Sequence, residues 1–356
     1  MRSIGRMLSG RIRPVFKRVV YFALYYSGML RLMLACFRKI KNEHVALILF
    51  YHRFHDDGAR QCLLPSLHVE EFERQIRHLK ELYTVASMDE VACSLRDGTG
   101  FSSPTVVVTM DDGYLDNYRL AYPVLKRHEI PAIVYVTTGL IGSRTGLWVD
   151  ELERAILSSR AQKVRCVEIC EGEELDIENW RDKKGAFGSI FRTLLPRNNE
   201  DRRKAIDELH VSLEIKDHAS LASPRLMLNW EEIRRMAGNG VSIGAHTASH
   251  PNLASLGHDA AGQEIRASKE ALEVQTGRKV RHFAIPNGKP EDFTAELGMF
   301  CQKAGFDTVV TTEPGVVFPD SDPMSLPRVI PPPPMWYFAC ETARYFFFPK
   351  RRMEGK

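Results

Sequence analysis

The sequence predicts an α/β fold built on a mainly parallel sheet, either closed into a barrel or open. Two observations support this prediction. Short apolar runs rich in β-branched residues are typical of strands buried on both faces, and helical patterns separate these runs. The runs are ALILFYH (46–52), TVVVTM (105–110), AIVYVT (132–137), VSIGA (241–245), HFAI (282–285) and TVVTT (308–312).

Two of the segments between the runs carry buried-type residues at helical spacing. One predicted helix contains Phe72, Ile76, Leu79 and Tyr83, and a second contains Ala261, Ile265, Ser268 and Leu272. Gly277 follows the second set, and glycine commonly ends a helix. We therefore expect both segments to form helices that alternate with the strands.

Residues 150–225 interrupt this alternation. They are charged and helix-prone (DELERAILSSR, RKAIDELHVSLEIKD) and lack strong strand patterns. We predict a helical insertion that covers one side of the site or forms a lid. The chain then consists of an N-terminal segment (1–41), a main domain (42–330) and a tail (331–356).

The basic residues are unevenly distributed. Residues 1–41 contain ten Lys or Arg and no Asp or Glu, so the rest of the chain has 39 basic and 45 acidic residues. A basic footprint on the folded body is therefore not indicated, and a nucleic-acid partner is not expected.

The N-terminal segment contains VVYFALYYSGMLRLMLACF (19–37), with basic residues on both flanks. Arg31 disfavours a simple membrane-spanning helix by about 3 kcal/mol. We expect a helix that lies in an anionic membrane interface, and the alternative is a helix packed on the domain. The tail, with Trp336, Tyr337 and Phe346–Phe348 beside Lys350, is either a second membrane contact or packs on the domain.

The seven cysteines are odd in number and mostly scattered, and no CxxC pair occurs. Free thiols in a reducing compartment are the simpler interpretation. With the basic segment, this predicts a protein at the cytoplasmic face of a bacterial inner membrane.

Polar residues stand where several predicted strands end. Parallel strands bring their carboxyl ends to one side of the fold, so these residues are expected to meet. His246 and His250 have a spacing that lets two imidazoles bind one ion. Asp111 and Asp112 are adjacent carboxylates, and a cation would let both stay ionised. One Asp and two His would make an open, catalytic kind of metal site.

Three motifs carry a family resemblance. TMDDGY (109–114) resembles the first motif of the polysaccharide deacetylase family (the NodB homology domain, carbohydrate esterase family 4), usually written TFDDG. HTASHPNL (246–253) resembles the second motif, H-S/T-x-x-H, and FAIPNG (283–288) resembles the weaker third. The resemblance runs from about Leu47 to Arg328 and implies a distorted (β/α) barrel.

The resemblance also implies residue roles. Asp111 would be the general base, and Asp112, His246 and His250 would bind one divalent metal. Zn is the expected metal, although the same donors suit Fe, Co, Ni or Mn. The substrate and oxyanion side of the site would include Tyr114, Pro286 and Asn287, with a backbone N–H near Asn287 stabilising the oxyanion.

Two positions depart from the family pattern. Ala284 stands where the third motif normally begins with an Arg that orients the catalytic Asp, and Arg328 is the candidate substitute. The usual general acid is a late His in a Leu-x-His motif, but no His follows His282. His52 is the replacement we favour, as in a branch whose last motif lies on the N-terminal side. A core histidine and an ordinary surface arginine are the competing interpretations.

The predicted function is metal-dependent hydrolysis of the N-acetyl group of an amino sugar, in a polysaccharide or lipid-linked glycan of the bacterial envelope. The alternatives are a deformylase or O-deacetylase acting on a lipid-linked sugar, and a catalytically silent carbohydrate-binding relative. The intact Asp-Asp-His-His set argues against the silent alternative.

Overall fold

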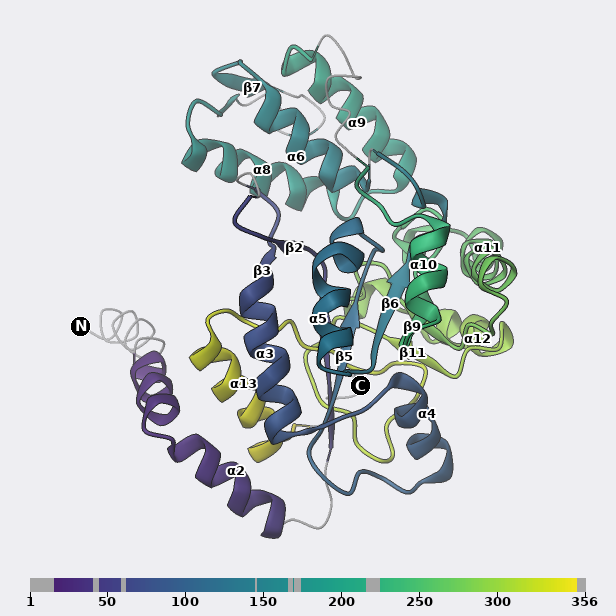
Figure 1. The fold of residues 1–356 in the computed structure, drawn as a ribbon. Helices are drawn as coiled ribbons and strands as arrows, with labels where there is room; N and C mark the ends of the chain where they lie inside the picture. Colours follow the sequence, from purple (N-terminus) through teal and green to yellow (C-terminus); the bar gives the residue numbers. More distant parts are fainter. Residues whose placement is uncertain are drawn as a thin grey trace, which may run out of the picture.

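The computed structural model describes residues 16–40, 45–58, 62–144, 146–165, 169, 174–215 and 225–350. Its centre is a curled sheet of seven parallel strands surrounded by helices (Figure 1). The strand order is β1-β5-β6-β9-β10-β11, and β4 pairs with the start of β5. The strands are β1 (Ala46–Tyr51), β4 (Thr84–Val85), β5 (Thr105–Met110), β6 (Ala132–Val136), β9 (Val241–Ala245), β10 (His282–Ala284) and β11 (Thr308–Val310).

All six predicted strands are present, and their burial explains the continuous apolar runs. Every residue of β1 and β5 is buried, because helices cover the outside of the sheet while its curled inner face packs on itself. A strand buried on both faces needs no polar alternation.

An irregular segment bridges the two outer strands of the sheet. Leu326 forms a parallel bridge with Val310 on β11, and Val329 forms one with Leu49 on β1. The backbone N–H of Phe50 also donates to the carbonyl of Val329 at 3.1 Å. The fold is therefore a distorted barrel, as predicted, in which residues 326–329 take the place of a closing strand.

The helices on the outside match the predicted periodicity. In α3 (Val69–Leu82), Phe72, Ile76 and Leu79 are fully buried against the main core. Helix α11 (His258–Thr276) ends at Gly277, whose φ of 66° is the left-handed conformation that glycine adopts most easily. The other helices around the sheet are α4 (Met88–Asp97), α5 (Tyr122–Arg127), α10 (Trp230–Ala237) and α12 (Ala295–Lys303).

The segment predicted as an insertion forms a second, separate apolar core. Figure 1 shows it above the barrel, on the side of the strand ends. The structure adds a short antiparallel ribbon, which the sequence did not indicate because three residues per strand are too few for a period-2 pattern. The elements are α6 (Trp148–Ser158), β7 (Lys163–Arg165), β8 (Glu174–Asp176), α8 (Trp180–Leu194) and α9 (Asn199–Ser212).

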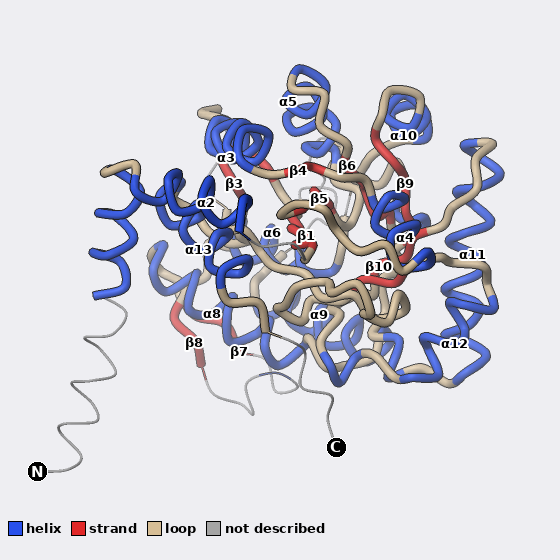
Figure 2. Tube along the Cα trace, turned by 90° about the horizontal axis from the view of Figure 1, so that it is seen from below, coloured by secondary structure: helices blue, strands red, loops and turns tan. Residues whose placement is uncertain are grey.

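The N-terminal segment forms two helices that pack on the domain through one face. Residues 16–26 are followed by α2 (Met29–Ile40), and the two axes bend by 78° at a break that contains Gly28. Leu30 and Leu34 are buried in the main core, beside α13 and α3. Figures 1 and 2 both show α2 next to α13. The alternative prediction, a helix packed on the domain, is therefore confirmed for the face that carries Leu30 and Leu34.

The tail packs on the domain as well. Helix α13 (Met335–Phe347) buries Phe338, Ala343 and Phe346 in the main core. The ring of Phe347 lies 5.1 Å from that of Phe37. Packing, rather than a separate membrane contact, thus accounts for most of the aromatic residues of the tail. Arg351, Arg352 and the first fifteen residues lie outside the described part of the chain.

Among the described residues, no single helix is long and apolar enough to cross a bilayer. The bent N-terminal pair meets the length and composition of a span only when its two halves are taken together.

A matched pair of glycine substitutions tests the curled sheet. A Cβ at Gly244 in β9 would overlap the ring of Tyr135 and lie 3.0 Å from the carbonyl oxygen of His282. Gly244→Ala should therefore lower the free energy of unfolding by about 1–3 kcal/mol. Gly185, exposed inside α8, has no atom within 4 Å of such a Cβ. Gly185→Ala should raise stability by about 0.5–1 kcal/mol, because alanine favours the helix. Urea unfolding measures both, and equal effects would contradict the packing described.

Candidate active site

A cavity of about 420 Å³ lies at the carboxyl ends of the strands, between the barrel and the insertion. The barrel side of the cavity is polar because β1, β5, β9 and β10 all end there. The polar lining residues are His52, Arg53, Asp111, Asp112, Tyr114, His246, His250, Asn287, Lys289 and Thr312. The structure therefore brings together residues that lie almost 240 positions apart in the chain.

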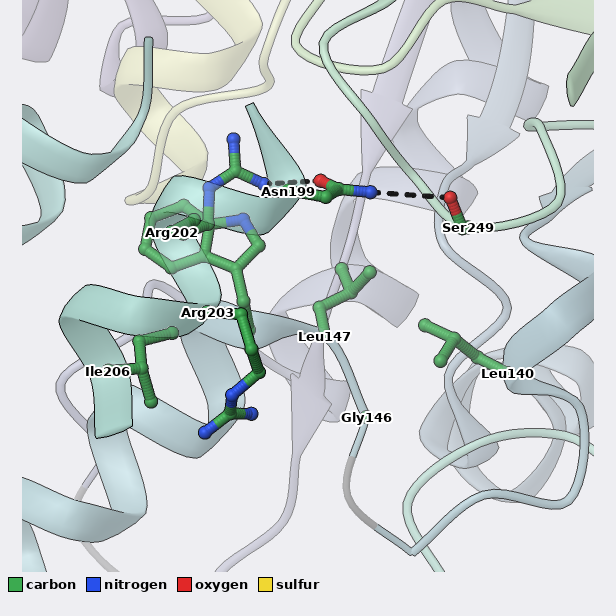
Figure 3. A pocket seen from close by; sticks show the side chains of 9 residues that line it. Leu140, Gly146, Leu147, Asn199, Arg202, Arg203, Ile206 and Ser249 are labelled. Atoms are coloured by element: carbon green, nitrogen blue, oxygen red, sulfur yellow. Dashed lines mark hydrogen bonds between the residues drawn. The ribbon is translucent and has the colours of Figure 1, made fainter. Parts of the chain in front are cut away.

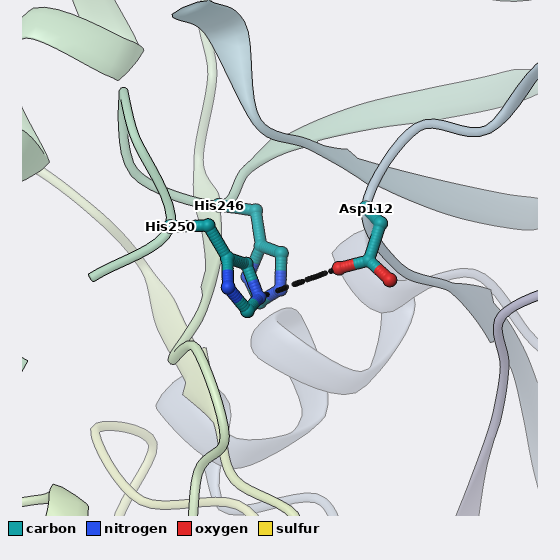
Figure 4. Close-up of side chains that lie close together, drawn as sticks. All are labelled: Asp112, His246 and His250. Atoms are coloured by element: carbon teal, nitrogen blue, oxygen red, sulfur yellow. Dashed lines mark ion pairs between the residues drawn. The ribbon is translucent and has the colours of Figure 1, made fainter. Parts of the chain in front are cut away.

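Asp112, His246 and His250 form a compact group (Figure 4). Oδ1 of Asp112 lies 3.4 Å from Nε2 of His246 and 3.4 Å from Nε2 of His250. One ligand atom from each residue lies within 4.8 Å of the others. These are the three residues predicted to bind a metal, and their donor atoms converge on one point.

The tautomer of His246 is set by its second nitrogen. Nδ1 lies 2.7 Å from the carbonyl oxygen of Ala284, which can only accept a hydrogen bond. Nδ1 therefore carries the proton, and the lone pair of Nε2 faces Asp112. Metal-ligating histidines are usually oriented in this way. A carboxylate and two imidazoles with this orientation fit a divalent metal that keeps an open position.

The loop that carries His250 is held from two sides. The backbone N–H of His250 donates to Oγ1 of Thr247 at 3.0 Å. Glu264 on α11 accepts from the backbone N–H groups of Ala248 and Ser249, both at 2.9 Å. Nothing in the sequence pointed to Glu264, because it is one of several acidic residues on an amphipathic helix.

Three residues of the site have left-handed backbone conformations. The φ angles are 72° at Asp112, 58° at His250 and 61° at Asn287. Asp, Asn and His are the non-glycine residues found most often in this region. Each of these turns directs its side chain or backbone to the cavity just past a strand end.

Asp111 forms a bidentate ion pair with Arg328. Nη1 and Nη2 lie 2.7 Å from Oδ1 and Oδ2, and Nε donates to the carbonyl of Thr311 at 2.8 Å. Burial alone would raise the pKa of Asp111, but the guanidinium outweighs it and holds the pKa below its usual range. Arg328 is 0% exposed and lies 4.5 Å from the ring of Phe50. The contact expected from Arg328 is thus present, and the surface-arginine interpretation is wrong.

The other predicted residues differ in their placement. His52 lines the cavity at the end of β1, 5.5 Å from the ring of Phe50. Asn287 lines it too, and its carbonyl accepts from the hydroxyl of Thr312 at 2.6 Å. Pro286 is buried behind the turn and is not part of the lining. The roles of His52 and Asn287 in catalysis stay predictions.

Tyr114 belongs to a buried network that the sequence did not reveal. Its hydroxyl donates to Asp150 at 3.0 Å, and Arg53 lies 4.3 Å above its ring. Arg53 also forms ion pairs with Asp116 at 2.7 Å and with Asp150 at 3.1 Å. Burial raises the pKa of Asp150 to about 7, against the opposing effect of Arg53. Asp150 lies on α6, so this network joins the insertion to the barrel beside the site.

The chain matches a family model described as polysaccharide deacetylase over residues 99–168 and 199–309, about half of its length. The match skips residues 169–198, which lie in the insertion. The Bacillus subtilis protein YxkH, assigned to the same family by its name, is 23% identical over 293 residues, which cover 82% of this chain and 73% of that one. The poly-beta-1,6-N-acetyl-D-glucosamine N-deacetylase of Staphylococcus epidermidis is 25% identical over 224 residues, or 58% of this chain and 74% of the relative.

Two solved structures share the fold. The deacetylase PplD of Streptococcus pyogenes, solved with acetate, superposes with a TM-score of 0.55 at 19% identity, covering 84% of this chain and 98% of the other. IcaB of Ammonifex degensii superposes with a TM-score of 0.53 at 20% identity, covering 85% and 98%. These likenesses support the distorted barrel.

Removing Arg328 tests the energetics of the buried ion pair. Arg328→Leu should cost about 3–5 kcal/mol of stability at neutral pH, because it leaves the Asp111 carboxylate buried and unpaired. The double variant Asp111→Asn/Arg328→Leu should recover part of this loss. Arg235→Leu, which removes an exposed pair with Glu231, is the control and should barely change the unfolding midpoint. An Arg328→Leu protein as stable as this control would contradict the interaction.

Proposed function

Because the chain belongs to the polysaccharide deacetylase family, we propose that it hydrolyses the N-acetyl group of an amino sugar in a polysaccharide or lipid-linked glycan of the bacterial envelope. The observation that carries the proposal is the convergence of Asp112, His246 and His250 beside the ionised Asp111 on one cavity. A base next to a three-ligand site is the arrangement expected of a hydrolase.

The three converging side chains would hold a divalent metal, which we propose to be Zn²⁺. When bound, such a metal polarises the amide carbonyl and lowers the pKa of water. The chain's own contribution is to fix the donors. The Ala284 carbonyl orients His246, and Glu264 holds the loop of His250.

Asp111 is placed to act as the general base. Each carboxylate oxygen accepts one N–H from Arg328, which leaves a second lone pair on each oxygen. The ion pair also keeps the carboxylate in the form that can accept a proton. We assign to Asp111 the proton of the attacking water, whose oxygen bonds to the amide carbon.

We assign His52 to the second proton transfer. It lines the same cavity as Asp111 and Asp112, from the end of β1. As the C–N bond breaks, the departing nitrogen must gain a proton, because an amine anion is a very poor leaving group. Delivery of that proton by His52 gives the free amino sugar, and acetate leaves.

The turn after β10 supplies the proposed oxyanion contact. The Thr312 hydroxyl holds the carbonyl of Asn287, and the N–H of Gly288 donates to the carbonyl of Pro286 at 2.7 Å. With the turn fixed in this way, the backbone N–H of Asn287 is our candidate donor to the developing oxyanion. Pro286 has no N–H, so its contribution is to shape the turn.

Acetate release from acetylated amino sugars tests this assignment. Purified protein should contain one divalent metal and release acetate. Asp112→Asn should weaken metal binding at least tenfold and remove turnover, because it removes a charged ligand. His52→Ala should lower kcat by about 10²–10⁴-fold with the metal content unchanged. Metal content is measured by elemental analysis, and acetate by an enzymatic assay.

The same assay separates the alternatives. Formate in place of acetate would identify a deformylase, and acetate from an O-acetylated but not an N-acetylated sugar would identify an O-deacetylase. A metal-loaded protein that acts on none of these substrates would refute the proposal and favour a carbohydrate-binding relative. Unchanged turnover in His52→Ala would refute the role of His52 alone.

We also propose that the enzyme works at the cytoplasmic face of the bacterial inner membrane, through the N-terminal helices. One face of these helices packs on the domain, while the other exposes large apolar side chains. The side chains that are at least 40% exposed are Phe16, Val19, Phe22, Tyr26, Met29, Leu32 and Met33. Such a dense exposed apolar set is typical of an interaction surface.

The charge of the segment favours anionic lipid as the partner. Residues 1–41 contain ten basic residues and no acidic ones. Of these, Arg18 and Arg38 lie exposed on the two helices. A basic amphipathic segment binds the anionic cytoplasmic leaflet with about 1 kcal/mol per basic residue near the surface. Cys36, Cys62, Cys93, Cys301 and Cys340 are not in disulfides, which is consistent with a reducing compartment.

Vesicle binding tests this surface. The full-length protein should bind vesicles rich in phosphatidylglycerol and lose affinity as salt rises. Phe22→Ser/Leu32→Ser should weaken binding at least tenfold, because each side chain loses apolar burial. Val274→Ser removes an even more exposed apolar residue, on α11, and should have no effect. Co-sedimentation measures the bound fraction, and self-association without vesicle binding would instead indicate a second copy as the partner.

A further inference from the structure

The active-site cavity has a second wall that the proposed reaction does not use. The insertion and the loop at residues 62–66 line it with apolar side chains. These include Leu64, Pro65, Leu147, Trp148, Phe191 and Leu195. Leu147 and Trp148 lie at the start of α6, Phe191 lies on α8, and Leu195 directly follows α8.

This apolar wall is well supported from behind. The rings of Trp148 and Phe191 are stacked, with centroids 5.6 Å apart and planes at 11°. The guanidinium of Arg202, on α9, lies 4.6 Å from the Trp148 ring. The same guanidinium donates to the carbonyls of Leu195 and Arg197 at 3.2 and 2.7 Å. The wall is thus part of the folded insertion.

The insertion is also joined to the loop of the second motif. Figure 3 shows the neighbouring cavity of about 120 Å³, where Asn199 connects Arg202 to Ser249. Arg202 donates to Asn199 at 3.1 Å, and Asn199 donates to Ser249 at 3.3 Å. Ser249 directly precedes His250, so the apolar wall and the metal-binding group keep a defined relation.

The chemistry of the wall favours aliphatic carbon over a sugar as its main occupant. Sugar hydroxyls need hydrogen-bond partners, and a wall without them leaves those hydroxyls unpaired at a cost. Leucine and proline side chains offer none, and the Trp148 ring already packs on Phe191 and Arg202. Aliphatic carbon is the chemistry that such a surface accepts.

We propose that this wall binds an aliphatic chain of the substrate while the scissile amide lies at the polar strand ends. The inference rests on the proposed deacetylation. It deepens that proposal by making the insertion the specificity element, since the family match skips residues 169–198, which include Phe191. The chain belongs either to a lipid attached to the sugar or to an N-acyl group longer than acetyl.

Two substrate series distinguish these sources. The first holds N-acetylglucosamine with methyl, butyl or octyl aglycones, and the second holds methyl glucosaminides with N-acetyl, N-butanoyl or N-octanoyl groups. With the metal-loaded, full-length enzyme, kcat/KM should rise along one series, by up to about fourfold for each buried methylene. A rise along the first indicates a lipid-borne sugar, and a rise along the second indicates a long acyl group.

Variants of the apolar wall provide the second part of the experiment. In Leu195→Asn and Phe191→Asn, the ratio of kcat/KM between the longest and shortest substrates should fall toward one. Val211→Asn, an exposed position on α9 of the same insertion, should keep the ratio of the unmodified enzyme. A thermal unfolding curve for each variant confirms that it is folded.

A flat response to chain length in both series would overturn the inference while leaving deacetylation intact. A rise that Leu195→Asn and Phe191→Asn do not diminish would overturn it as well. Failure to release any acid from the shortest substrates would instead count against the proposed function.

Discussion

The buried ion pair between Arg328 and Asp111 joins the architecture of this protein to its chemistry. Arg328 lies on the segment that bridges β11 and β1, and Asp111 directly follows β5. The pair therefore connects the closure of the barrel to the lining of the cavity. A bidentate guanidinium offsets the cost of burying a carboxylate. The barrel therefore closes around a buried ion pair rather than around a purely apolar interior.

The same pair explains why Ala284 is tolerated where the family usually has an arginine. What the buried Asp111 carboxylate requires is a guanidinium within reach, and neighbouring strands of a curled sheet can supply it from different points in the chain. The sequence suggested Arg328 because it follows a late strand, but the contact depends on how residues 326–329 close the barrel. Residues 326–329 form only isolated bridges to the strands, so no regular pattern in the sequence predicts their position.

The fold was predictable where burial leaves a pattern in the sequence. The continuous apolar runs of β1 and β5 and the helical spacing of Phe72, Ile76 and Leu79 are such patterns. The convergence of Asp112, His246 and His250 was predictable because short motifs hold them at strand ends. Glu264, Arg53 and Asp150 were not, because their importance comes from partners 15 to 97 residues away. The orientation of the N-terminal helices was equally out of reach, since apolar residues cover both of their faces.

The left-handed backbone at Asp112, His250 and Asn287 affects how substitutions at the site are to be interpreted. Asp, His and Asn tolerate this conformation, whereas alanine and β-branched residues do not adopt it readily. An alanine there removes a functional group and also strains the turn, so a lost activity overstates the chemical role. Asparagine keeps the turn and changes only the ligand or the charge. It is therefore the cleaner probe at Asp112 and His250, while glycine suits position 287, where the proposed donor is the backbone itself.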